Sequence, residues 1–492
     1  MPEADLLLAV DQGSTSTKAL VVDRHGDVQR VATSALRTSY PRPGWVEQNA
    51  DEIVDSVRDA VASVTEDIEP SRVIGVCISS QRESMVLWER QTGKPLGPLV
   101  SWQDQRTTQM CKDLEARGVG DQVWQVTGLP LDPMFSGSRA TWLLDTYDPN
   151  REGARSGRLS LGTVDSWLLT QLTGEHQTEP GNASRTQLMN LRSRTWDDEL
   201  LELFAVPPNV LPAIAPSSRS FGTIRGLDPL LDGTPVLAVL ADSHAALFAH
   251  GAWSPGQVKA TYGTGSSVMG VCDLNAAVPA GLCLTVAWEG DGPTYALEGN
   301  IRASGSTVAW LARTVGLTPA ALAEAARGTT TSGGVYLVPA FNGLGAPWWD
   351  PDAEAVVTGL TLGSELAHLA RAALESIAHQ VEDVLDAMST AAGPLTDVLA
   401  DGGAAENQDL MQLQADISDR TVRSSSVTHL SPVGAAHLGG LAAGLWTREE
   451  LSRWPRQRTS YRPRLDPTNR RNVRAGWASA MARARLRPEA PS

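Results

Sequence analysis

Residues 11–17 read Asp-Gln-Gly-Ser-Thr-Ser-Thr, and this polar stretch lies between two short apolar runs. The runs, residues 6–10 and 19–22, are rich in Leu and Val and too short for helices, so they predict the strands of a buried hairpin. A tight turn with glycine and hydroxyl residues directs N–H groups and hydroxyls at one point, which suits a phosphate. Asp11, at the end of the first strand, is placed to face the same point and hold a metal ion. An ordinary polar hairpin turn is the alternative.

A second stretch of the same kind occupies residues 258–267, Val-Lys-Ala-Thr-Tyr-Gly-Thr-Gly-Ser-Ser, and is followed by the apolar residues 268–271. Two strand–turn–strand hairpins about half the chain apart predict two related domains that face each other across a nucleotide. Chance repetition is the alternative, because loops favour Gly, Ser and Thr. We place the junction near residue 250, which gives domains of residues 1–250 and 251–492.

Composition limits the possible functions. A chain of 492 residues is too long for one core, and 42% apolar with 20% charged residues is typical of a globular protein. The net charge of −15 argues against binding nucleic acid. No apolar run approaches the ~18 residues of a membrane span, and the N-terminus does not resemble a signal peptide. We expect a cytoplasmic protein whose four cysteines are reduced and buried: Cys77, Cys111, Cys272 and Cys283.

The remaining pattern alternates between strands and helices, which predicts an α/β protein. In the first half we expect strands at 27–33, 72–79, 85–88 and 235–240, with helices at 53–64, 161–174 and 196–204. In the second half we expect strands at 282–288, 294–298 and 398–401, with helices at 302–315, 366–388 and 434–445. The Arg-rich C-terminal tail from Arg453 is predicted to form a solvated surface helix, and a contact with a polyanion or another subunit is the alternative.

Asp242 is the candidate general base. It follows a wholly apolar predicted strand, and ligand chemistry in α/β sheets collects at such strand ends. A carboxylate there can accept the proton of an attacking hydroxyl, while phosphoryl transfer otherwise depends on positioning and charge neutralisation. The alternative is a cap for the helix that starts near Ala245.

Arg82 and Glu83 follow another predicted strand and offer adjacent donors and acceptors, which the hydroxyls of a polyol need. A surface ion pair is the alternative. His244 and Trp102 are candidates for the same pocket, although single aromatic residues more often belong to the core.

Glycines near residues 13, 263 and 402 allow a backbone to approach phosphates or a purine closely. The P-loop pattern is absent, because Gly93-Lys94 is followed by Pro95, and protein-kinase signatures are absent too. Phosphoryl transfer in this chain therefore requires another scaffold.

With these residues assembled, the chain resembles the FGGY family of carbohydrate kinases, and most closely its glycerol kinase branch. The likeness runs from about residue 6 to at least 447. Its motifs are Asp11-Gln-Gly-Ser-Thr-Ser-Thr, Gly44-Trp-Val-Glu-Gln, Gln81-Arg-Glu, Trp102-Gln-Asp, Phe135-Ser-Gly, Gly162-Thr-Val-Asp-Ser-Trp, Asn182-Ala-Ser-Arg-Thr, Thr261-Tyr-Gly-Thr-Gly, Gly343-Leu-Gly-Ala-Pro-Trp-Trp-Asp and Asp401-Gly-Gly-Ala.

The resemblance implies two actin-like (ribonuclease-H-like) domains that close on MgATP and a small sugar or polyol. It implies phosphate contacts by Ser14, Thr15, Ser16 and Lys18, nucleotide contacts by Thr264, Gly305, Gly403 and Asn407, and Mg²⁺ near Asp11 and Asp242. Asp242 would be the base, Arg82 and Glu83 would grip the acceptor, and Trp102 would line its pocket. Dimers are common in the family, so a homodimer is possible.

Three expected acceptor-site positions depart from glycerol kinase. Met134 replaces a Tyr, Ser243 replaces a Gln and Ser267 replaces a Phe, while His244 adjoins the second of these. Fewer hydrogen-bond partners and more space favour a polyol or ketose of four or five carbons, because discrimination built on hydroxyl contacts is steep. Glycerol kinase proper is the alternative. A non-catalytic sugar- or nucleotide-responsive binding protein and an assembly-forming actin relative fit less well, because Asp11, Asp242 and the acceptor pocket are retained.

Overall fold

The computed structural model describes residues 4–487, so residues 1–3 and the last part of the Arg-rich tail, residues 488–492, lie outside the described residues. The chain forms two compact units, neither of which is continuous in sequence. The first consists of Met1–Trp253, Leu284–Ala296 and His429–Trp454, and the second of Ser254–Cys283, Leu297–Thr428 and Pro455–Ser492. The domain boundary near residue 250 stays a prediction.

The first unit is built on a five-stranded sheet of order β13-β5-β1-β2-β3. The expected hairpin is confirmed: β1 and β2 pair antiparallel, with Asp11 opposite Lys18, and β3 continues the antiparallel part. β5 and β13 instead run parallel to β1. The bounds are β1 Leu6–Gln12, β2 Ser16–Asp23, β3 Val28–Ala35, β5 Val73–Ser80 and β13 Val236–Ala241.

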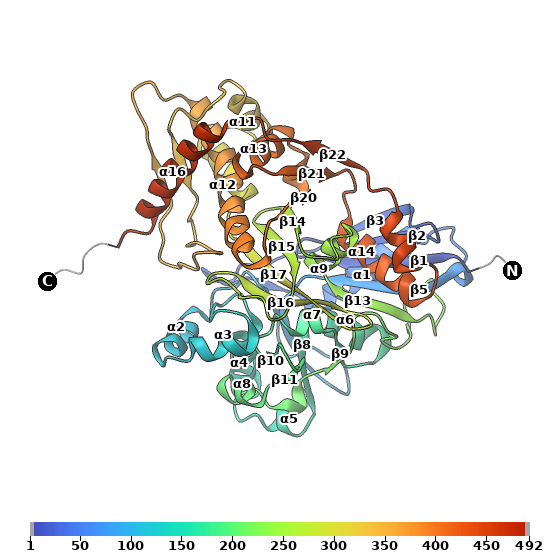
Figure 1. The fold of residues 1–492 in the computed structure, drawn as a ribbon. Helices are drawn as coiled ribbons and strands as arrows, with labels where there is room; N and C mark the ends of the chain where they lie inside the picture. The colour runs from blue at the N-terminus through green and yellow to red at the C-terminus, as the bar shows by residue number, and fades with distance from the viewer. Residues whose placement is uncertain (1–3, 488–492) are drawn as a thin grey trace. The chain divides into compact units, whose positions relative to one another are not determined.

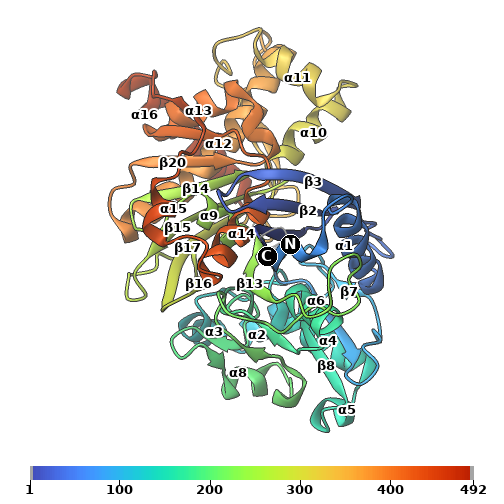
Figure 2. The ribbon, with the colours of Figure 1, turned by 90° about the vertical axis from the view of Figure 1, so that its right-hand side faces the viewer.

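Helices cover both faces of this sheet because its central strands are buried on both sides. Leu6, Leu8 and Val10 share a core with helix α1 (Ala50–Val64), whose N-terminus is capped by the Asn49 side chain. Alternate residues of a strand point to opposite faces, so Cys77 in β5 lies opposite that core, against helix α14 (Leu430–Ala442). Figure 2 shows α1 and α14 on either side of the strands.

The first unit also contains a smaller sheet of order β4-β7-β6-β8 and several helices, of which α2, α3, α4, α5 and α8 are labelled in Figure 1. The helix expected at 161–174 is partly wrong, because residues 159–163 form β8 and pair with β6, and only Val164–Thr173 is helical. The elements are β4 Glu47–Gln48, β6 Met85–Glu89, β7 Leu99–Val100, β8 Leu159–Thr163, α2 Thr108–Ala116, α3 Gly120–Thr127, α4 Ser136–Tyr147, α5 Glu152–Arg155, α6 Val164–Thr173, α7 Pro180–Ala183, α8 Asp198–Leu203, α9 Asp242–Ala249 and α15 Arg448–Arg453.

The second half of the chain contributes a seven-stranded sheet of order β16-β17-β15-β14-β20-β21-β22. Its strands are β14 Gln257–Tyr262, β15 Ser266–Cys272, β16 Cys283–Glu289, β17 Pro293–Ile301, β20 Asp397–Asp401, β21 Thr421–Ser425 and β22 Arg458–Tyr461. The helices are α10 Gly305–Thr314, α11 Pro319–Ala326, α12 Leu366–Ala392, α13 Gln408–Ser418 and α16 Pro467–Ala484.

The C-terminal tail differs from the expected solvated helix. Its helix α16 buries Trp477 and Met481 in a core of the second unit, and the Trp477 indole donates a hydrogen bond to Asp383 of α12 at 2.9 Å. Arg474 of the same helix forms an ion pair with Asp383 at 2.7 Å. The arginines of this segment are thus attached to a helix that packs like any other amphipathic one.

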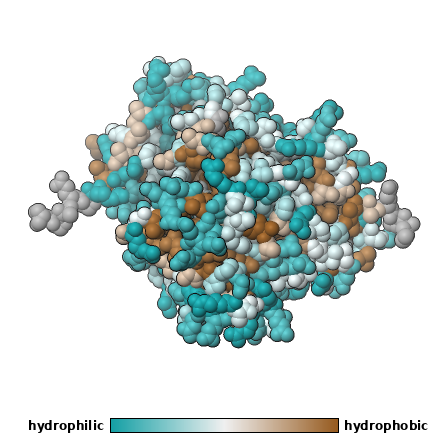
Figure 3. Space-filling model, turned by 60° about the horizontal axis from the view of Figure 1, so that its bottom comes forward, coloured by the Kyte–Doolittle hydropathy of each residue, from teal (hydrophilic) through white to brown (hydrophobic). Residues whose placement is uncertain are grey.

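On the face drawn in Figure 3 hydrophilic residues predominate, with apolar residues in separate patches among them. Within residues 4–487, no helix combines the length and the apolar character needed to cross a membrane. All four cysteines are buried, as expected, and none of them forms a disulfide bond.

Candidate active site

The turn between β1 and β2 presents hydroxyl groups at the sheet edge. The N–H of Gly13 donates to the carbonyl of Ser16 at 3.0 Å, which closes the turn. The side-chain amide of Gln48 donates a hydrogen bond to the carbonyl of Ser14 at 2.7 Å. Ser14, Thr15 and Ser16 remain partly or fully exposed, and the hydroxyl of Ser14 also donates to Oε1 of Gln81 at 3.3 Å.

Three parallel strands bring the acidic candidates to this edge. Asp11 lies at the end of β1 opposite Ser79 of β5, and β13 ends opposite Ser80, directly before Asp242. Because the carboxyl ends of parallel strands meet at one edge, residues far apart in sequence gather there. Asp11 and Asp242 are close enough that the charge of Asp242 raises the pKa of Asp11.

The electrostatics of Asp11 fit a cation. Burial, with the charge of Asp242 as a second cause, raises the pKa of Asp11 to about 6, although Ser79 donates a hydrogen bond to its Oδ1 at 2.7 Å. Two carboxylates that repel each other are relieved by a cation between them. Among the described residues no group of three or more His, Cys, Asp or Glu side chains is arranged for a metal ion. One or two carboxylates combined with phosphate oxygens is, however, the ligand set that Mg²⁺ uses.

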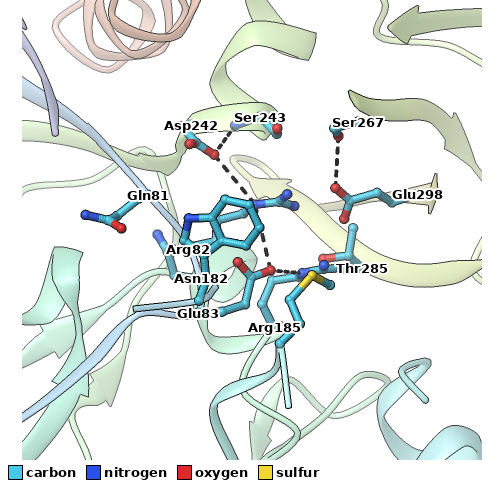
Figure 4. Close-up of polar contacts among 12 residues, drawn as sticks. Gln81, Arg82, Glu83, Asn182, Arg185, Asp242, Ser243, Ser267, Thr285 and Glu298 are labelled. Atoms are coloured by element: carbon cyan, nitrogen blue, oxygen red, sulfur yellow. Dashed lines mark hydrogen bonds and ion pairs between the residues drawn. The ribbon is translucent and has the colours of Figure 1, made fainter. Parts of the chain in front are cut away.

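Asp242 is the first residue of α9 and its side chain is 35% exposed. Its Oδ1 accepts a hydrogen bond from the N–H of Ser243 at 2.6 Å and lies 3.6 Å from Nε of Arg82 (Figure 4). Asp242 is not the N-cap of α9, because Ala241 takes that position and no side chain among the described residues caps the helix, so the capping alternative is wrong. The Asp242 carboxylate also stays accessible beside a guanidinium, which keeps it suited to the role of base.

Arg82 and Glu83 form a buried pair directly after β5. Nε of Arg82 lies 3.9 Å from Oε1 of Glu83, and both side chains are less than 10% exposed, so the surface-ion-pair alternative is wrong. Trp102 lies beside them: its backbone N–H bonds the Ser84 hydroxyl at 3.0 Å and its indole Nε1 bonds the Ser14 hydroxyl at 3.0 Å. The candidate acceptor pocket and the phosphate hairpin are thereby hydrogen-bonded to each other within the first unit.

Two buried arginines beneath this pair were missed by the sequence reasoning. Arg185 donates to Oε1 of Glu83 at 2.6 Å, and Arg139 donates to the carbonyl of Glu83 at 2.9 Å. Both arginines are fully buried. Arg185 belongs to the Asn-Ala-Ser-Arg-Thr motif, but nothing in its sequence context indicates that it faces Glu83, and Arg139 is an isolated charge in a helix.

The other expected acceptor residues take different positions. Ser243 and Met134 are partly exposed, whereas His244 is fully buried. A Cβ on Gly181 would lie 2.7 Å from Nδ1 of His244, so the imidazole packs closely behind the start of α9. His244 is thus buried behind the start of α9, and its contact with a substrate stays a prediction.

The buried carboxylate Glu179 lies in the same layer. It accepts hydrogen bonds from the N–H groups of Gly181 and Asn182 at 2.7 and 2.5 Å and from the Ser217 hydroxyl at 2.7 Å. Burial, and secondly the charge of Asp165, raises the pKa of Glu179 to about 8. Glu179 caps the short helix α7, which precedes Arg185, so it contributes to fixing that segment.

The second unit contains a cavity of about 680 Å³ at the β14–β15 turn. The N–H of Gly305 donates to the Gly263 carbonyl at 2.9 Å, and that of Ser304 donates to the Thr264 carbonyl at 2.9 Å. The rings of Trp310 and Phe341, 4.7 Å apart, lie in its lining. The complete lining is Tyr262, Gly263, Thr264, Arg302, Ala303, Gly305, Ser306, Ala309, Trp310, Arg313, Phe341, Asn342, Gly403 and Ala404.

Glycine is required where the backbone passes behind this cavity. Gly402 has a φ of +90°, and a Cβ there would lie 2.5 Å from the Tyr262 carbonyl oxygen. Gly403 and Thr264, both expected at the nucleotide, line the cavity, and Asn407 does not. The Asn407 side chain instead caps α13 by accepting from the N–H groups of Asp409 and Leu410.

Ser267 also belongs to the second unit, on β15. Its hydroxyl donates to Oε1 of the buried Glu298 at 3.1 Å (Figure 4). Lys18, the remaining phosphate candidate, lies on β2 opposite Asp11, whose pKa it lowers slightly. The roles of both side chains toward a ligand stay predictions.

Comparison with known proteins places this arrangement among sugar and polyol kinases. Residues 6–249 match the N-terminal domain of the FGGY family of carbohydrate kinases, and residues 258–443 match its C-terminal domain. Glycerol kinase of Koribacter versatilis is 41% identical over 97% of this chain and 98% of its own length. Apulose kinase of Pectobacterium atrosepticum is also 41% identical, over 99% of both chains.

Comparison with solved structures supports the same family fold. Plasmodium falciparum glycerol kinase with ADP superposes with a TM-score of 0.89 at 26% identity, covering 99% of both chains. Ligand-bound xylulose kinase from Lactobacillus acidophilus has the same fold, with a TM-score of 0.88 at 22% identity over 97% of this chain and 98% of its own. The expected fold of two actin-like domains is confirmed.

Proposed function

Since this chain belongs to the FGGY family of carbohydrate kinases, we propose that its acceptor is a small polyol or ketose of four or five carbons. The chain is an ATP-dependent phosphotransferase that uses an alcohol group as acceptor, as its family and relatives show. The identity of the acceptor and the roles of single residues are the proposal.

The observation that carries the proposed chemistry is the contact between Asp242 and Arg82. The accessible carboxylate of Asp242 lies 3.6 Å from the guanidinium of Arg82, which adjoins Glu83. The proposed base therefore lies next to the pair of residues proposed to bind the acceptor. Arg82 donates to acceptor oxygens, Glu83 accepts from a hydroxyl, and Asp242 removes the proton of the hydroxyl that attacks the γ-phosphate. The Asp242 side chain is 35% exposed, and this role requires that a hydroxyl can reach it.

Asp11 and Asp242 are the residues that would hold Mg²⁺. The raised pKa of Asp11 supports this assignment, since a buried carboxylate beside a second one binds a divalent cation favourably. When bound, the cation would neutralise charge on the phosphates of ATP. Ser14, Thr15, Ser16 and Lys18 would contact those phosphates, and the glycine-lined cavity of the second unit would take the nucleoside.

The acceptor preference follows from three side chains. Met134 and Ser243 are partly exposed beside the grip, and both lack the longer hydrogen-bonding groups expected for a glycerol site. Ser267 bonds the buried Glu298, which leaves a small polar group where an aromatic ring is expected. The similar proteins do not decide between glycerol and a longer acceptor, because a glycerol kinase and an apulose kinase are both 41% identical to this chain.

Glycerol itself is the second candidate, supported by the Arg82–Glu83 pair. The test is coupled ADP release with MgATP and a panel of polyols and ketoses of three to six carbons, including glycerol, xylulose and apulose. A kcat/KM for a longer acceptor at least tenfold above that for glycerol is expected, and a clear preference for glycerol would reverse the order. We also propose a cytoplasmic enzyme, with a homodimer as its possible state, which sedimentation would check.

A further inference from the structure

Glu83, the acidic half of the acceptor grip, has an unfavourable backbone conformation. Its φ of +61° lies in the left-handed region that residues other than glycine rarely adopt. The N–H of Ser84 bonds the carbonyl of Arg82 at 2.6 Å, which closes a three-residue turn around Glu83. Such a conformation persists only where surrounding groups fix it, and it is common at functional sites.

The carbonyl of Glu83 is fixed by the first turn of α4. The Ser136 hydroxyl donates to it at 2.8 Å and Nη2 of Arg139 donates to it at 2.9 Å. Ser136 and Arg139 are three residues apart on a helix, so they share one face and reach the same oxygen. The orientation of the peptide group after Glu83 is thereby set by two buried donors.

The carboxylate of Glu83 is fixed by a different arginine. Nε of Arg185 donates to Oε1 at 2.6 Å, and the guanidinium of Arg185 lies 4.9 Å from the centre of the Phe135 ring, which it covers. A charge-assisted bond between buried groups is directional and strong. With Oε1 engaged, Oε2 is the oxygen oriented to accept from an acceptor hydroxyl.

Arg139 also reaches the other segments of the acceptor pocket. Its guanidinium donates to the carbonyl of Pro133 at 2.6 Å, to that of Met134 at 2.5 Å and to that of Trp102 at 3.5 Å. Burial lowers the pKa of Arg139 to about 10, so the side chain remains charged at neutral pH. One planar cation with five donors thus joins three chain segments, which the single ammonium of a lysine cannot do.

We propose that Arg139 and Arg185 are positioning residues that hold Glu83 in its left-handed conformation and thereby set acceptor affinity and selectivity. Arg139, with Ser136, fixes the peptide group, and Arg185 fixes the carboxylate. Both arginines are fully buried, so we expect them to act through Glu83 and not by contact with the substrate. The inference rests on the proposed function for its kinetic part, while the conformation of Glu83 tests it independently of any activity.

The first experiment compares Arg139→Lys with Arg151→Lys. Arg151 is a matched control, because it is also buried in the first unit and donates to a carbonyl, that of Ala205 at 3.1 Å, away from the pocket. We expect Arg139→Lys to raise the acceptor KM at least tenfold and to lower the selectivity between acceptors, with the KM for ATP changed less than twofold. Arg151→Lys is expected to change thermal stability alone. If the two variants changed the acceptor KM and the selectivity to the same extent, the positioning role of Arg139 would be overturned.

Ser136→Ala is the milder variant, in case the lysine variant does not fold. Loss of one of two bonds to the Glu83 carbonyl should raise the acceptor KM about threefold to fivefold, and an unchanged KM would contradict the proposal. Arg185→Lys should retain part of the affinity that Arg185→Met loses, because a lysine can still pair with the carboxylate.

A crystal structure of Ser136→Ala supplies a readout that does not depend on activity. Relaxation of Glu83 toward negative φ, or a peptide group with two alternative orientations, is expected. If the wild-type enzyme phosphorylates no acceptor of the panel, the proposed function fails, but the conformation of Glu83 in this variant still decides whether the donors fix it. An unchanged Glu83 would overturn the inference even if the kinase activity is confirmed.

Discussion

The indole Nε1 of Trp102 donates a hydrogen bond to the hydroxyl of Ser14 at 3.0 Å. This bond joins a residue of the proposed acceptor pocket to the turn expected to contact phosphate, within the same unit. Trp102→Phe keeps an aromatic ring and removes the donor, which is worth about 1 kcal/mol. We expect KM to rise about fivefold for both ATP and the acceptor. Trp196→Phe is the control, since its indole bonds the Pro212 carbonyl at 2.8 Å elsewhere in the unit. A change in only one KM would argue against coupling through this bond.

Asp242→Asn should lower kcat about 10²- to 10⁴-fold, the usual contribution of a general base, because the amide cannot accept the hydroxyl proton. ATP binding, measured by calorimetry, is expected to be weakened far less than kcat. Asp197→Asn serves as control, because Asp197 also bonds an N–H at a helix start, that of Leu200 at 3.1 Å, without a proposed role in catalysis. Undiminished turnover of Asp242→Asn would contradict the assignment of Asp242 as the base.

Asp11→Asn should stabilise the ligand-free protein at neutral pH while abolishing activity. Burial and Asp242 raise the pKa of Asp11 to about 6 in the folded protein, above its usual 3.8. Because the pKa of Asp11 is higher in the folded than in the unfolded protein, the protonated carboxyl favours folding. This stabilisation is fully present below about pH 4 and is lost as the pH rises through 6. At pH 7.5 the ionised carboxylate therefore costs about 1–3 kcal/mol after allowance for its partial exposure.

Thermal unfolding between pH 4 and 8 checks this prediction. The stabilisation by Asp11→Asn should vanish near pH 4, and MgATP should raise the Tm of the wild type more than that of the variant. Asp55→Asn is the control, because Asp55 is exposed and pairs with Arg58 at 3.1 Å. If Asp11→Asn destabilises the protein at pH 7.5, the repulsion inferred at this edge of the sheet is absent.

Gly305→Ala tests the nucleotide cavity. A Cβ at this position would lie 2.7 Å from the Gly263 carbonyl oxygen, so the β14–β15 turn must shift away from α10. We expect the KM for ATP to rise about tenfold with little change in the KM for the acceptor. Gly363→Ala is the control, since its Cβ would meet only the Thr361 hydroxyl at 3.8 Å. A normal KM for ATP in Gly305→Ala would place the nucleotide elsewhere.

The fold was largely predictable because its strands are continuous apolar runs and its turns carry glycine. The hairpin around Gly13 and the strand before Asp242 follow from local pattern, and so does helix α12, which was expected at 366–388 and spans Leu366–Ala392. The residues that the sequence did not reveal depend on tertiary contacts. Arg139 and Arg185 look like ordinary charges, and only folding shows that each is buried against Glu83. The strand at residues 161–163 was mistaken for helix because its pairing with β6 is not local.

His244 also shows that the direction of a side chain is not evident from the sequence alone. Its place two residues after Asp242 suggested a pocket residue, yet helix α9 turns it inward, against Gly181. The sequence identifies which segments form the site, whereas the direction of each side chain depends on packing between segments.

Helix α14 packs on α9 and β5, and two of its glycines make this possible. A Cβ on Gly434 would lie 1.8 Å from the Ala245 carbonyl oxygen, and one on Gly439 would lie 2.2 Å from Sγ of Cys77. During synthesis, the helix that begins at Asp242 is therefore without its packing partner until residues 430–442 have left the ribosome. A chain that stops before this helix leaves an apolar face of the first unit open to water, so the unit that carries the proposed base is completed only near the end of translation.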